Sequence, residues 1–257
     1  MIEVSDISVF AGKKQIIGSV SFSASAGENI AIIGPNGAGK TTLLKALAGL
    51  NGFLGDIRIS GVSIRNMDSI QKGKTVSYIP QAGDVDGGFT VRSFLELARY
   101  PYRRPWEPLS IDDLKAVDDA VSLTDCGNFM DRELGTLSGG ERQRVLIAGA
   151  IAQDCRIVLL DEPGSFLDPV QRELISRLVS SIAVERKRLV LTVTHEINDA
   201  MNHASRILVM SGGSLVFDGT PEKLAAENVL ESVFNAGFVK MNNPVTGKTV
   251  YFPGVLK

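Results

Sequence analysis

A glycine-rich segment near the amino terminus has the residue types and spacing of a phosphate-binding loop. It reads Gly-Pro-Asn-Gly-Ala-Gly-Lys-Thr over residues 34–41 and follows the apolar residues 30–33. Glycines let successive backbone N–H groups point inward around phosphate oxygens, and the amino terminus of a following helix adds partial positive charge there. The segment matches a motif that binds nucleoside triphosphates, so it predicts a nucleotide site.

The side chains of this loop predict further contacts. Lys40 should reach the β- and γ-phosphates, and the Thr41 hydroxyl should ligate Mg²⁺. The residues that we expect to contact the nucleotide are Asn36, Gly37, Ala38, Gly39, Lys40, Thr41 and Thr42. Two other Gly-Lys-Thr triplets, at residues 73–75 and 247–249, lack the first glycine of the motif. We interpret both as chance matches.

Two adjacent acids follow the apolar residues 157–160, which are typical of a strand buried on both faces of a parallel sheet. An acid at the carboxyl end of such a strand lies beside the crevice where α/β sheets bind ligands. We therefore expect Asp161 to hold Mg²⁺, through water, and Glu162 to act as the general base for the attacking water. Alone, this pair would indicate only a solvated strand end; the phosphate loop favours the catalytic interpretation.

The elements that must position these residues follow from hydrophobic periodicity. Strands are expected at residues 2–10, 16–24, 29–33, 54–59, 75–79, 156–160, 189–194 and 206–210. Helices are expected at residues 41–48, 91–99, 111–121, 140–152, 169–184, 196–203 and 221–225, and a loop at residues 82–88. Strands alternating with helices predict a doubly wound α/β fold, into which the helices of residues 91–152 are inserted.

Composition excludes several classes of protein. A hydrophobic content of 44% and a charged content of 22% are ordinary for a globular protein, and the net charge of −2 gives no basic field for nucleic acid. Cys126 and Cys155 match no zinc or redox spacing, so we interpret them as reduced thiols. No apolar run approaches the roughly 20 residues that span a bilayer. Glu3 and Asp6 stand where a secretory signal would carry bases. We therefore expect a cytoplasmic protein.

A second helix start has phosphate-binding character. Residues 137–141 read Leu-Ser-Gly-Gly-Glu, so Ser138, Gly139 and Gly140 present free N–H groups at the start of the helix expected at residues 140–152. The segment resembles the signature of the ABC ATPase family, Leu-Ser-Gly-Gly-Gln/Glu. The resemblance implies that these three residues contact the γ-phosphate of ATP bound to the phosphate loop of a second subunit. A homodimer then encloses two ATP molecules at a two-fold interface.

Further motifs resemble the family in the same order. Gln81 resembles its glutamine-loop residue, which contacts Mg²⁺ or the attacking water and links to the helical subdomain. His195 resembles the switch histidine that contacts the γ-phosphate, although a lone histidine at a strand end is more often structural. Residues 165–168 resemble the loop that communicates across the dimer, with Phe166 where the family usually has alanine. His203 has no such context and is interpreted as structural.

One feature of the family is missing. An aromatic residue that usually stacks on adenine, just before Gly12, is replaced here by Ala11, with Phe10 adjacent. Phe10 is expected either to take over this contact or to lie in the core, as strand alternation favours. The sequence leaves the preference between ATP and GTP open.

The resemblance covers about residues 2–253. It implies an α/β fold with a P-loop NTPase core and mostly parallel sheet, an amino-terminal antiparallel β subdomain and an inserted helical subdomain. We expect one ABC ATPase domain over residues 1–257. Its nucleotide-binding core comprises residues 1–82 and 153–257, and its helical subdomain about residues 83–152.

Residues 97–103 and 243–248 resemble stretches of the subgroup that serves iron–siderophore, haem and cobalamin uptake. The resemblance implies an ATP-hydrolysing importer subunit on the inner face of the cell membrane. Its partners would be integral-membrane permease subunits and, indirectly, a substrate-binding protein. It implies no nucleic-acid partner. The substrate and the permease are not given by the sequence.

Two alternatives remain. The chain could serve another ABC importer or an exporter. It could also be a soluble ABC ATPase of DNA repair or translation, but it has no coiled-coil insertion, second ATPase domain or basic tract to favour that class.

Overall fold

The computed structural model describes residues 1–81, 88–104, 106–244 and 247–254. The loop expected at residues 82–88 lies almost wholly outside the described residues. The strands are β1 (Ile2–Ala11), β2 (Lys14–Ala24), β3 (Asn29–Ile33), β4 (Leu54–Ile59), β5 (Val62–Ser63), β6 (Val76–Ile79), β7 (Ile157–Asp161), β8 (Leu189–Val193), β9 (Arg206–Ser211), β10 (Ser214–Gly219), β11 (Phe238–Asn242) and β12 (Thr249–Pro253). The α-helices are α1 (Lys40–Leu47), α2 (Ser69–Thr75), α3 (Val91–Leu97), α4 (Ile111–Thr124), α5 (Gly139–Ala152), α6 (Pro169–Val184), α7 (Ile197–His203), α8 (Pro221–Ala226) and α9 (Val229–Phe234).

The central sheet has the strand order β10-β9-β3-β8-β7-β6. Its strands from β9 to β6 pair in parallel, and β10 joins antiparallel at one edge. Every residue of β3 and β7 is buried, which explains why residues 30–33 and 157–160 are uninterrupted apolar runs in the sequence. The mostly parallel α/β sheet predicted from the sequence is confirmed.

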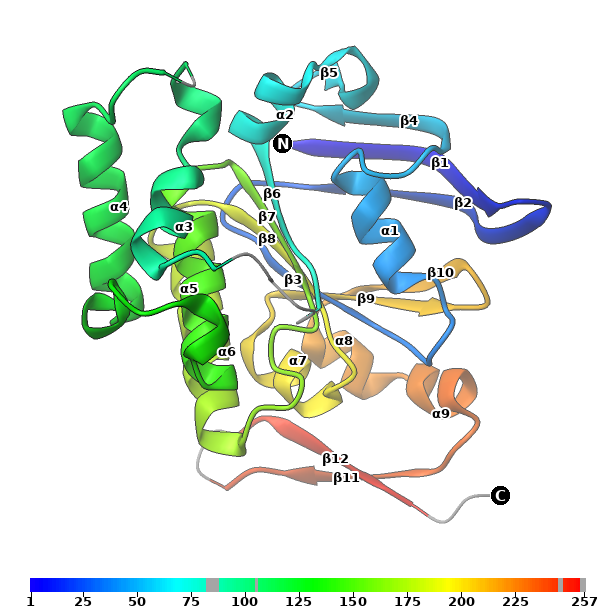
Figure 1. Ribbon diagram of the computed structural model, residues 1–257. Helices are drawn as coiled ribbons and strands as arrows, with labels where there is room; N and C mark the ends of the chain where they lie inside the picture. The colour runs from blue at the N-terminus through cyan, green and yellow to red at the C-terminus, as the bar shows by residue number, and fades with distance from the viewer. Residues whose placement is uncertain (82–87, 105, 245–246, 255–257) are drawn as a thin grey trace.

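A second sheet covers one side of α1. It has the order β2-β1-β4-β5, and its paired strands are antiparallel. Figure 1 shows α1 between this sheet and the central one. The leucines of α1 at positions 43, 44 and 47 are fully buried in one apolar cluster with residues of both sheets, among them Ile2, Ile57 and Leu159. Because α1 packs against a sheet on each side, the loop that precedes it is held in a fixed position.

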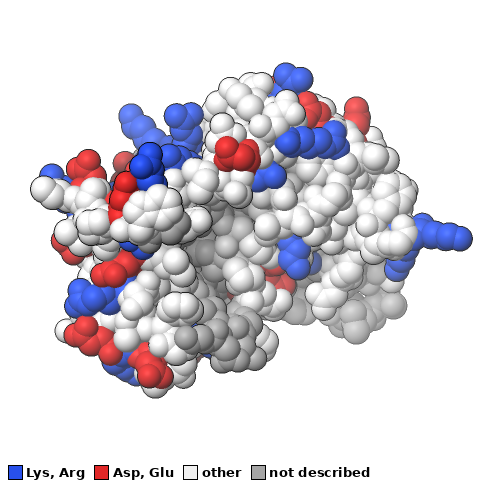
Figure 2. Space-filling view, turned by 45° about the horizontal axis from the view of Figure 1, so that its top comes forward, with Lys and Arg blue, Asp and Glu red and all other residues white. Residues whose placement is uncertain are grey.

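Helices α3, α4 and α5 form a separate group at the left of Figure 1. They share an apolar cluster that includes Val91, Val117 and Val145. A buried ion pair joins them: Arg99 Nε donates to Asp113 Oδ1 over 2.8 Å, and Arg99 Nη1 donates to the Ala152 carbonyl over 2.7 Å. Figure 2 shows acidic and basic side chains interspersed on one face of the molecule. Among the described residues, no helix has the length and hydropathy of a membrane span.

The structure differs most from the sequence prediction before β6 and after β9. The strand expected at residues 75–79 begins one residue later, because Thr75 ends helix α2, which was not predicted. Asp68 begins this helix in a reciprocal capping box with Gln71. The Gly-Lys-Thr triplet at residues 73–75 lies within α2. Beyond β9 we expected only the helix at residues 221–225; the structure adds β10, α9 and the β11–β12 hairpin. Tyr251 of that hairpin is buried, and its ring packs edge-on against Phe238.

The Arg99–Asp113 pair gives a prediction for stability. Replacing Arg99 by methionine (Arg99→Met) leaves a buried carboxylate without its cation, so the free energy of unfolding should fall by about 3–5 kcal/mol in urea denaturation. The matched control is Arg92→Met, which removes the exposed pair with Asp131 and should cost less than about 1 kcal/mol. Equal losses in the two variants would contradict the structural role of Arg99.

The pH dependence of this pair has a definite sign. Burial alone would raise the pKa of Asp113, but hydrogen bonds from Ser110 and Arg99 outweigh it and hold the pKa below its ordinary value of 3.8. A depressed pKa in the folded state stabilises the fold above the ordinary value, and this contribution is lost as the pH falls through the lower, folded pKa.

Candidate functional site

The phosphate loop connects β3 to α1 and depends on backbone that only glycine adopts without strain. Gly34 has φ of 147°, and a Cβ there would lie 2.1 Å from the Met210 carbonyl oxygen of the neighbouring strand β9. Gly39 caps α1 with φ of 96°. The loop therefore passes close to β9 and turns directly into the helix, which leaves the first N–H groups of α1 available to an anion.

The Lys40 side chain lies inside this loop. It is only 7% exposed, and its Nζ donates to the carbonyl oxygens of Gly34 at 2.8 Å and Pro35 at 3.0 Å. Burial lowers the pKa of Lys40, and the negative charges of Glu162 and Asp161 oppose that shift. A phosphate group would give this buried ammonium a full counter-charge, which the two carbonyl groups do not.

Asp161 ends β7 beside Thr41. Its carboxylate is 2% exposed; Oδ1 accepts from the Thr41 hydroxyl at 2.9 Å and Oδ2 from the Tyr78 hydroxyl at 3.2 Å. Burial raises the pKa of Asp161, and the two hydroxyl donors partly offset that shift. Burial, with the charge of Asp161, also raises the pKa of Tyr78, which therefore stays a donor. The hydroxyl and carboxylate oxygens fit Mg²⁺, because this ion takes oxygen ligands and would stabilise the buried anion.

Glu162 follows Asp161 but has different partners. Its φ of 51° is in the left-handed region, and its N–H donates to the Val193 carbonyl. Its Oε2 accepts from Gln81 Nε2 at 3.0 Å and from the Ser165 hydroxyl at 2.8 Å. His195 Nδ1 lies 3.3 Å from the same oxygen. The left-handed turn thus separates two adjacent carboxylates, and Glu162 meets three polar groups from three different loops.

The second helix start lies in a groove away from the phosphate loop. Ser138 caps α5 in a reciprocal capping box with Glu141. Its own N–H donates to Glu141 Oε2 at 2.8 Å, so the expectation that this N–H is free is wrong. Gly139 is exposed. The groove has a volume of about 400 Å³. Its lining is formed by the start of α5 and the segment before α6, namely Ser138, Gly139, Gly140, Glu141, Arg144, Phe166, Leu167, Asp168 and Gln171. No residue of the phosphate loop lines it, so an anion in this groove would not contact the Lys40 site of the same chain.

The structure brings most of the predicted residues together and corrects one interpretation. Lys40, Thr41, Asp161 and Glu162 meet where β3 and β7 end. Gln81 contacts Glu162, whereas its expected role as a metal ligand stays a prediction. The alternative that placed Phe10 in the core is wrong, because its side chain is 48% exposed at the end of β1.

Tyr78 is the residue that the sequence prediction missed. It donates to Asp161 because β6 pairs with β7 in a register that places Tyr78 opposite Leu159. The apolar pattern of the two strands does not reveal which strand lies beside which, so the sequence held no signal for this contact.

Comparisons with known proteins agree with this geometry. Residues 17–165 match the profile of the family described as ABC transporter. The chain is 38% identical to the petrobactin import ATP-binding protein FpuC of Bacillus anthracis over 81% of this chain and 77% of that protein. It is 34% identical to the hemin import ATP-binding protein HmuV of Rhodococcus jostii over 96% and 84%. A solved transporter described as of the metal-chelate type, in an inward-facing conformation, has a TM-score of 0.85 at 22% identity and covers 99% of this chain and 97% of its own.

The buried ammonium predicts a strong effect on nucleotide affinity. Lys40→Ala removes the cation inside the phosphate loop, so ATP binding measured by calorimetry should weaken by about 100-fold or more. The matched control is Lys74→Ala in the second Gly-Lys-Thr triplet, which lies in α2 and should leave the affinity unchanged. A Lys40→Ala variant with unchanged affinity would exclude the phosphate role.

Proposed function

This chain belongs to the ABC transporter family, and we propose that it is the ATP-hydrolysing subunit that powers a membrane importer for iron–siderophore complexes, haem or cobalamin. The observation that carries the proposal is the meeting of Lys40, Thr41, Asp161 and Glu162 at the ends of β3 and β7. The relatives named above are import ATP-binding proteins for petrobactin and hemin, which supports this class of cargo.

We propose that ATP lies along the start of α1. Backbone N–H groups of residues 36–42 would surround the phosphates, and Lys40 would neutralise the β- and γ-phosphates. Thr41 and Asp161 would hold Mg²⁺, which neutralises the charge that develops on the phosphates. Phe10 is exposed beside the position of the missing adenine contact, which supports its role as the stacking residue.

The reaction that these groups suit is phosphoryl transfer to water. Glu162 would take the proton of the attacking water, and the donors from Gln81 and Ser165 fix the direction of its carboxylate. His195 is half exposed and lies between Glu162 and Glu196, and its imidazole would turn toward the γ-phosphate when ATP binds. The protein's contribution is then mainly positioning and charge neutralisation.

A second subunit would complete each site. The groove at Ser138, Gly139 and Gly140 lies away from its own phosphate loop, and the N–H groups of Gly139 and Gly140 would face the nucleotide of the partner there, as a head-to-tail dimer needs. ATP binding would close the two subunits around two nucleotides, and loss of the γ-phosphate would let them open. The helical group α3–α5 and the Gln81 loop would pass this motion to permease subunits.

We propose that the chain works on the cytoplasmic face of the membrane. Docking to integral-membrane permease subunits would hold it there, and an external substrate-binding protein would deliver the cargo to the permease. Residues 97–103, which resemble the iron-chelate subgroup, also have a structural role in this chain. Arg99 of that stretch forms the buried ion pair with Asp113.

If Glu162 is the general base, replacing it should slow ATP hydrolysis without weakening ATP binding. Glu162→Gln keeps the shape of the site but cannot accept the proton, so kcat for ATP should fall roughly 10²- to 10⁴-fold. ATP affinity should be retained, and ATP should now trap the dimer on size-exclusion chromatography. Glu185→Gln, an exposed change after α6, serves as the control. Normal turnover by Glu162→Gln would show that another group is the base.

The transport function is tested by purifying the tagged chain from detergent-solubilised membranes of its source. We expect a polytopic permease to co-purify, identified by mass spectrometry, and its binding protein then defines which iron chelate, haem or cobalamin to test. Recovery from the soluble fraction alone, with ribosomal or DNA-repair proteins, would leave the ATPase chemistry standing and overturn the importer.

A further inference from the structure

A cluster of three potential metal ligands lies outside the ATP site. Glu173 of α6 and Asp199 and His203 of α7 each offer one ligand atom, and these atoms all lie within 4.8 Å of one another. Asp199 and His203 are four residues apart, so they face the same side of α7. His203 Nε2 is 2.9 Å from Glu173 Oε2, and Arg177 contacts the other carboxylate oxygen of Glu173 at 2.7 Å.

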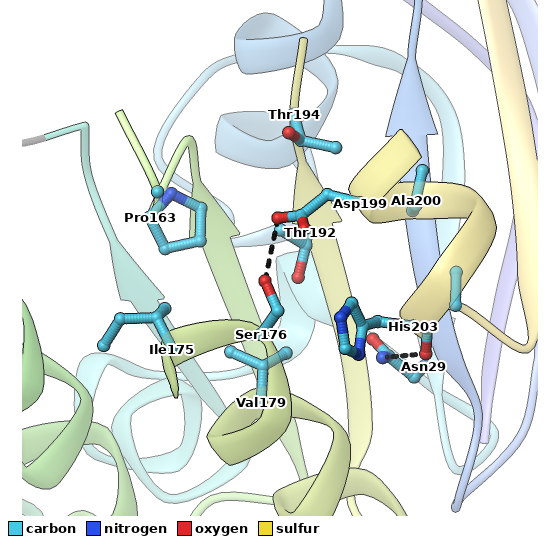
Figure 3. Close-up of a pocket in the computed structure, with 13 residues that line it drawn as sticks. Asn29, Pro163, Ile175, Ser176, Val179, Thr192, Thr194, Asp199, Ala200 and His203 are labelled. Carbon is cyan, nitrogen blue, oxygen red and sulfur yellow. Dashed lines mark hydrogen bonds between the residues drawn. The ribbon is translucent and has the colours of Figure 1, made fainter. Parts of the chain in front are cut away.

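Two residues of the cluster, Asp199 and His203, line a cavity between β8, α6 and α7, and Glu173 lies outside its lining. Figure 3 shows Ser176, Thr192, Asp199 and His203 converging on this space. Its volume is about 40 Å³. A cavity needs only about 10–15 Å³ on this measure to hold one water, so an ion with a water ligand has room. The Thr192 hydroxyl oxygen lines it, is buried, and has no hydrogen-bond partner among the described residues.

Hydrogen bonds from neighbouring residues hold two of the three potential ligand residues in place. Asp199 Oδ2 accepts from the Ser176 hydroxyl at 2.8 Å, and Asn29 Nδ2 donates to the His203 carbonyl at 2.9 Å. A cation between the two helices would accept the spare lone pairs of Asp199 and balance the negative charges of Asp199 and Glu173.

We propose that Glu173, Asp199 and His203 form a binding site for a late first-row divalent cation of the Zn²⁺ class. Zn²⁺ accepts imidazole nitrogen together with carboxylate oxygen, whereas Mg²⁺ and Ca²⁺ prefer oxygen ligands only. Tetrahedral bonds of about 2.0–2.2 Å put ligand atoms roughly 3.4 Å apart. Glu173 Oε2 and His203 Nε2, which are 2.9 Å apart, must therefore separate by about half an ångström. The ligand atom of Asp199 lies within 4.8 Å of both, so it must approach them by at most about 1.4 Å. Water would take the fourth position.

The cavity beside the cluster also touches the loops that follow β7 and β8. The same cavity is lined by Pro163 and Gly164, which follow Glu162, and by Thr194, which precedes His195. A cation that joins α6 to α7 would therefore fix the two segments that carry the proposed general base and switch histidine. This consequence rests on the proposed ATPase role, whereas binding of the cation does not.

Zn²⁺ binding by the purified, nucleotide-free full chain tests the proposal. Wild type should take one equivalent of Zn²⁺ from a chromogenic chelator, in the presence of excess Mg²⁺. His203→Gln keeps a hydrogen-bonding side chain but removes a direct ligand. Its Zn²⁺ affinity should therefore fall by roughly 10- to 100-fold or more, since even the loss of a residue that only orients a ligand has an effect of this size. The control is His195→Gln, which removes the other histidine of the chain and should retain the equivalent. Zn²⁺ should also raise Tm in wild type but not in His203→Gln.

Three results would overturn the site: no Zn²⁺ equivalent in wild type, unchanged affinity in His203→Gln, or loss of the equivalent in His195→Gln. If His203→Gln does not fold, Glu173→Gln replaces it, because Glu173 is partly exposed and lies on α6. Wild-type Zn²⁺ affinity in Glu173→Gln overturns the proposal equally. Because no nucleotide is present, failure here is distinct from failure of the ATPase assignment.

Discussion

The burial of ionised groups at the carboxyl edge of the central sheet is the constraint on which the rest of the structure depends. Lys40 and Asp161 are almost wholly buried, and removing such groups from water is costly unless each has partners. Carbonyl groups of the phosphate loop surround the ammonium, and two hydroxyl donors hold the carboxylate. These partners lie within reach only because α1 is clamped between two sheets and β3 and β7 are buried along their whole length. The apolar core therefore fixes a polar site whose buried ammonium and carboxylate fit a phosphate group and a metal ion.

One backbone torsion, the positive φ of Glu162, gives the adjacent carboxylates of Asp161 and Glu162 different surroundings. If Glu162 continued the extended strand, its side chain would point to the opposite face of the sheet from Asp161, toward the apolar side chains of α5 and α6. The left-handed conformation instead places its carboxylate between Gln81, Ser165 and His195. A non-glycine residue in this region is uncommon, and such strain persists where surrounding contacts hold it. Here the bond from its N–H to Val193 and the three side-chain partners do so.

Short-range patterns were sufficient to predict most of the fold but not the contacts between its parts. Buried strands and helix starts carry their signal in consecutive residues, so β3, β7 and α6 could be located from the sequence. Strand register and loop packing depend on residues far apart in the chain. That is why the bond from Tyr78 to Asp161 and the one from Gln81 to Glu162 were not predicted. The β11–β12 hairpin was missed because its stability comes from Tyr251 and Phe238 packing on distant helices, and its own strands are short and mixed in polarity.

Phe166 links the local backbone to the proposed assembly. Its side chain is 91% exposed and its φ of 64° is again left-handed, although the residue is large. Leaving a phenylalanine in water forgoes roughly 1.5–3 kcal/mol of transfer free energy, and the left-handed backbone adds strain. Within one chain nothing among the described residues offsets both costs. Phe166 lines the same groove as Ser138 and Gly139, so a surface that covers the groove would also bury the ring. A second copy of the chain, bringing its nucleotide to that groove, would satisfy the free helix N–H groups and the exposed ring together.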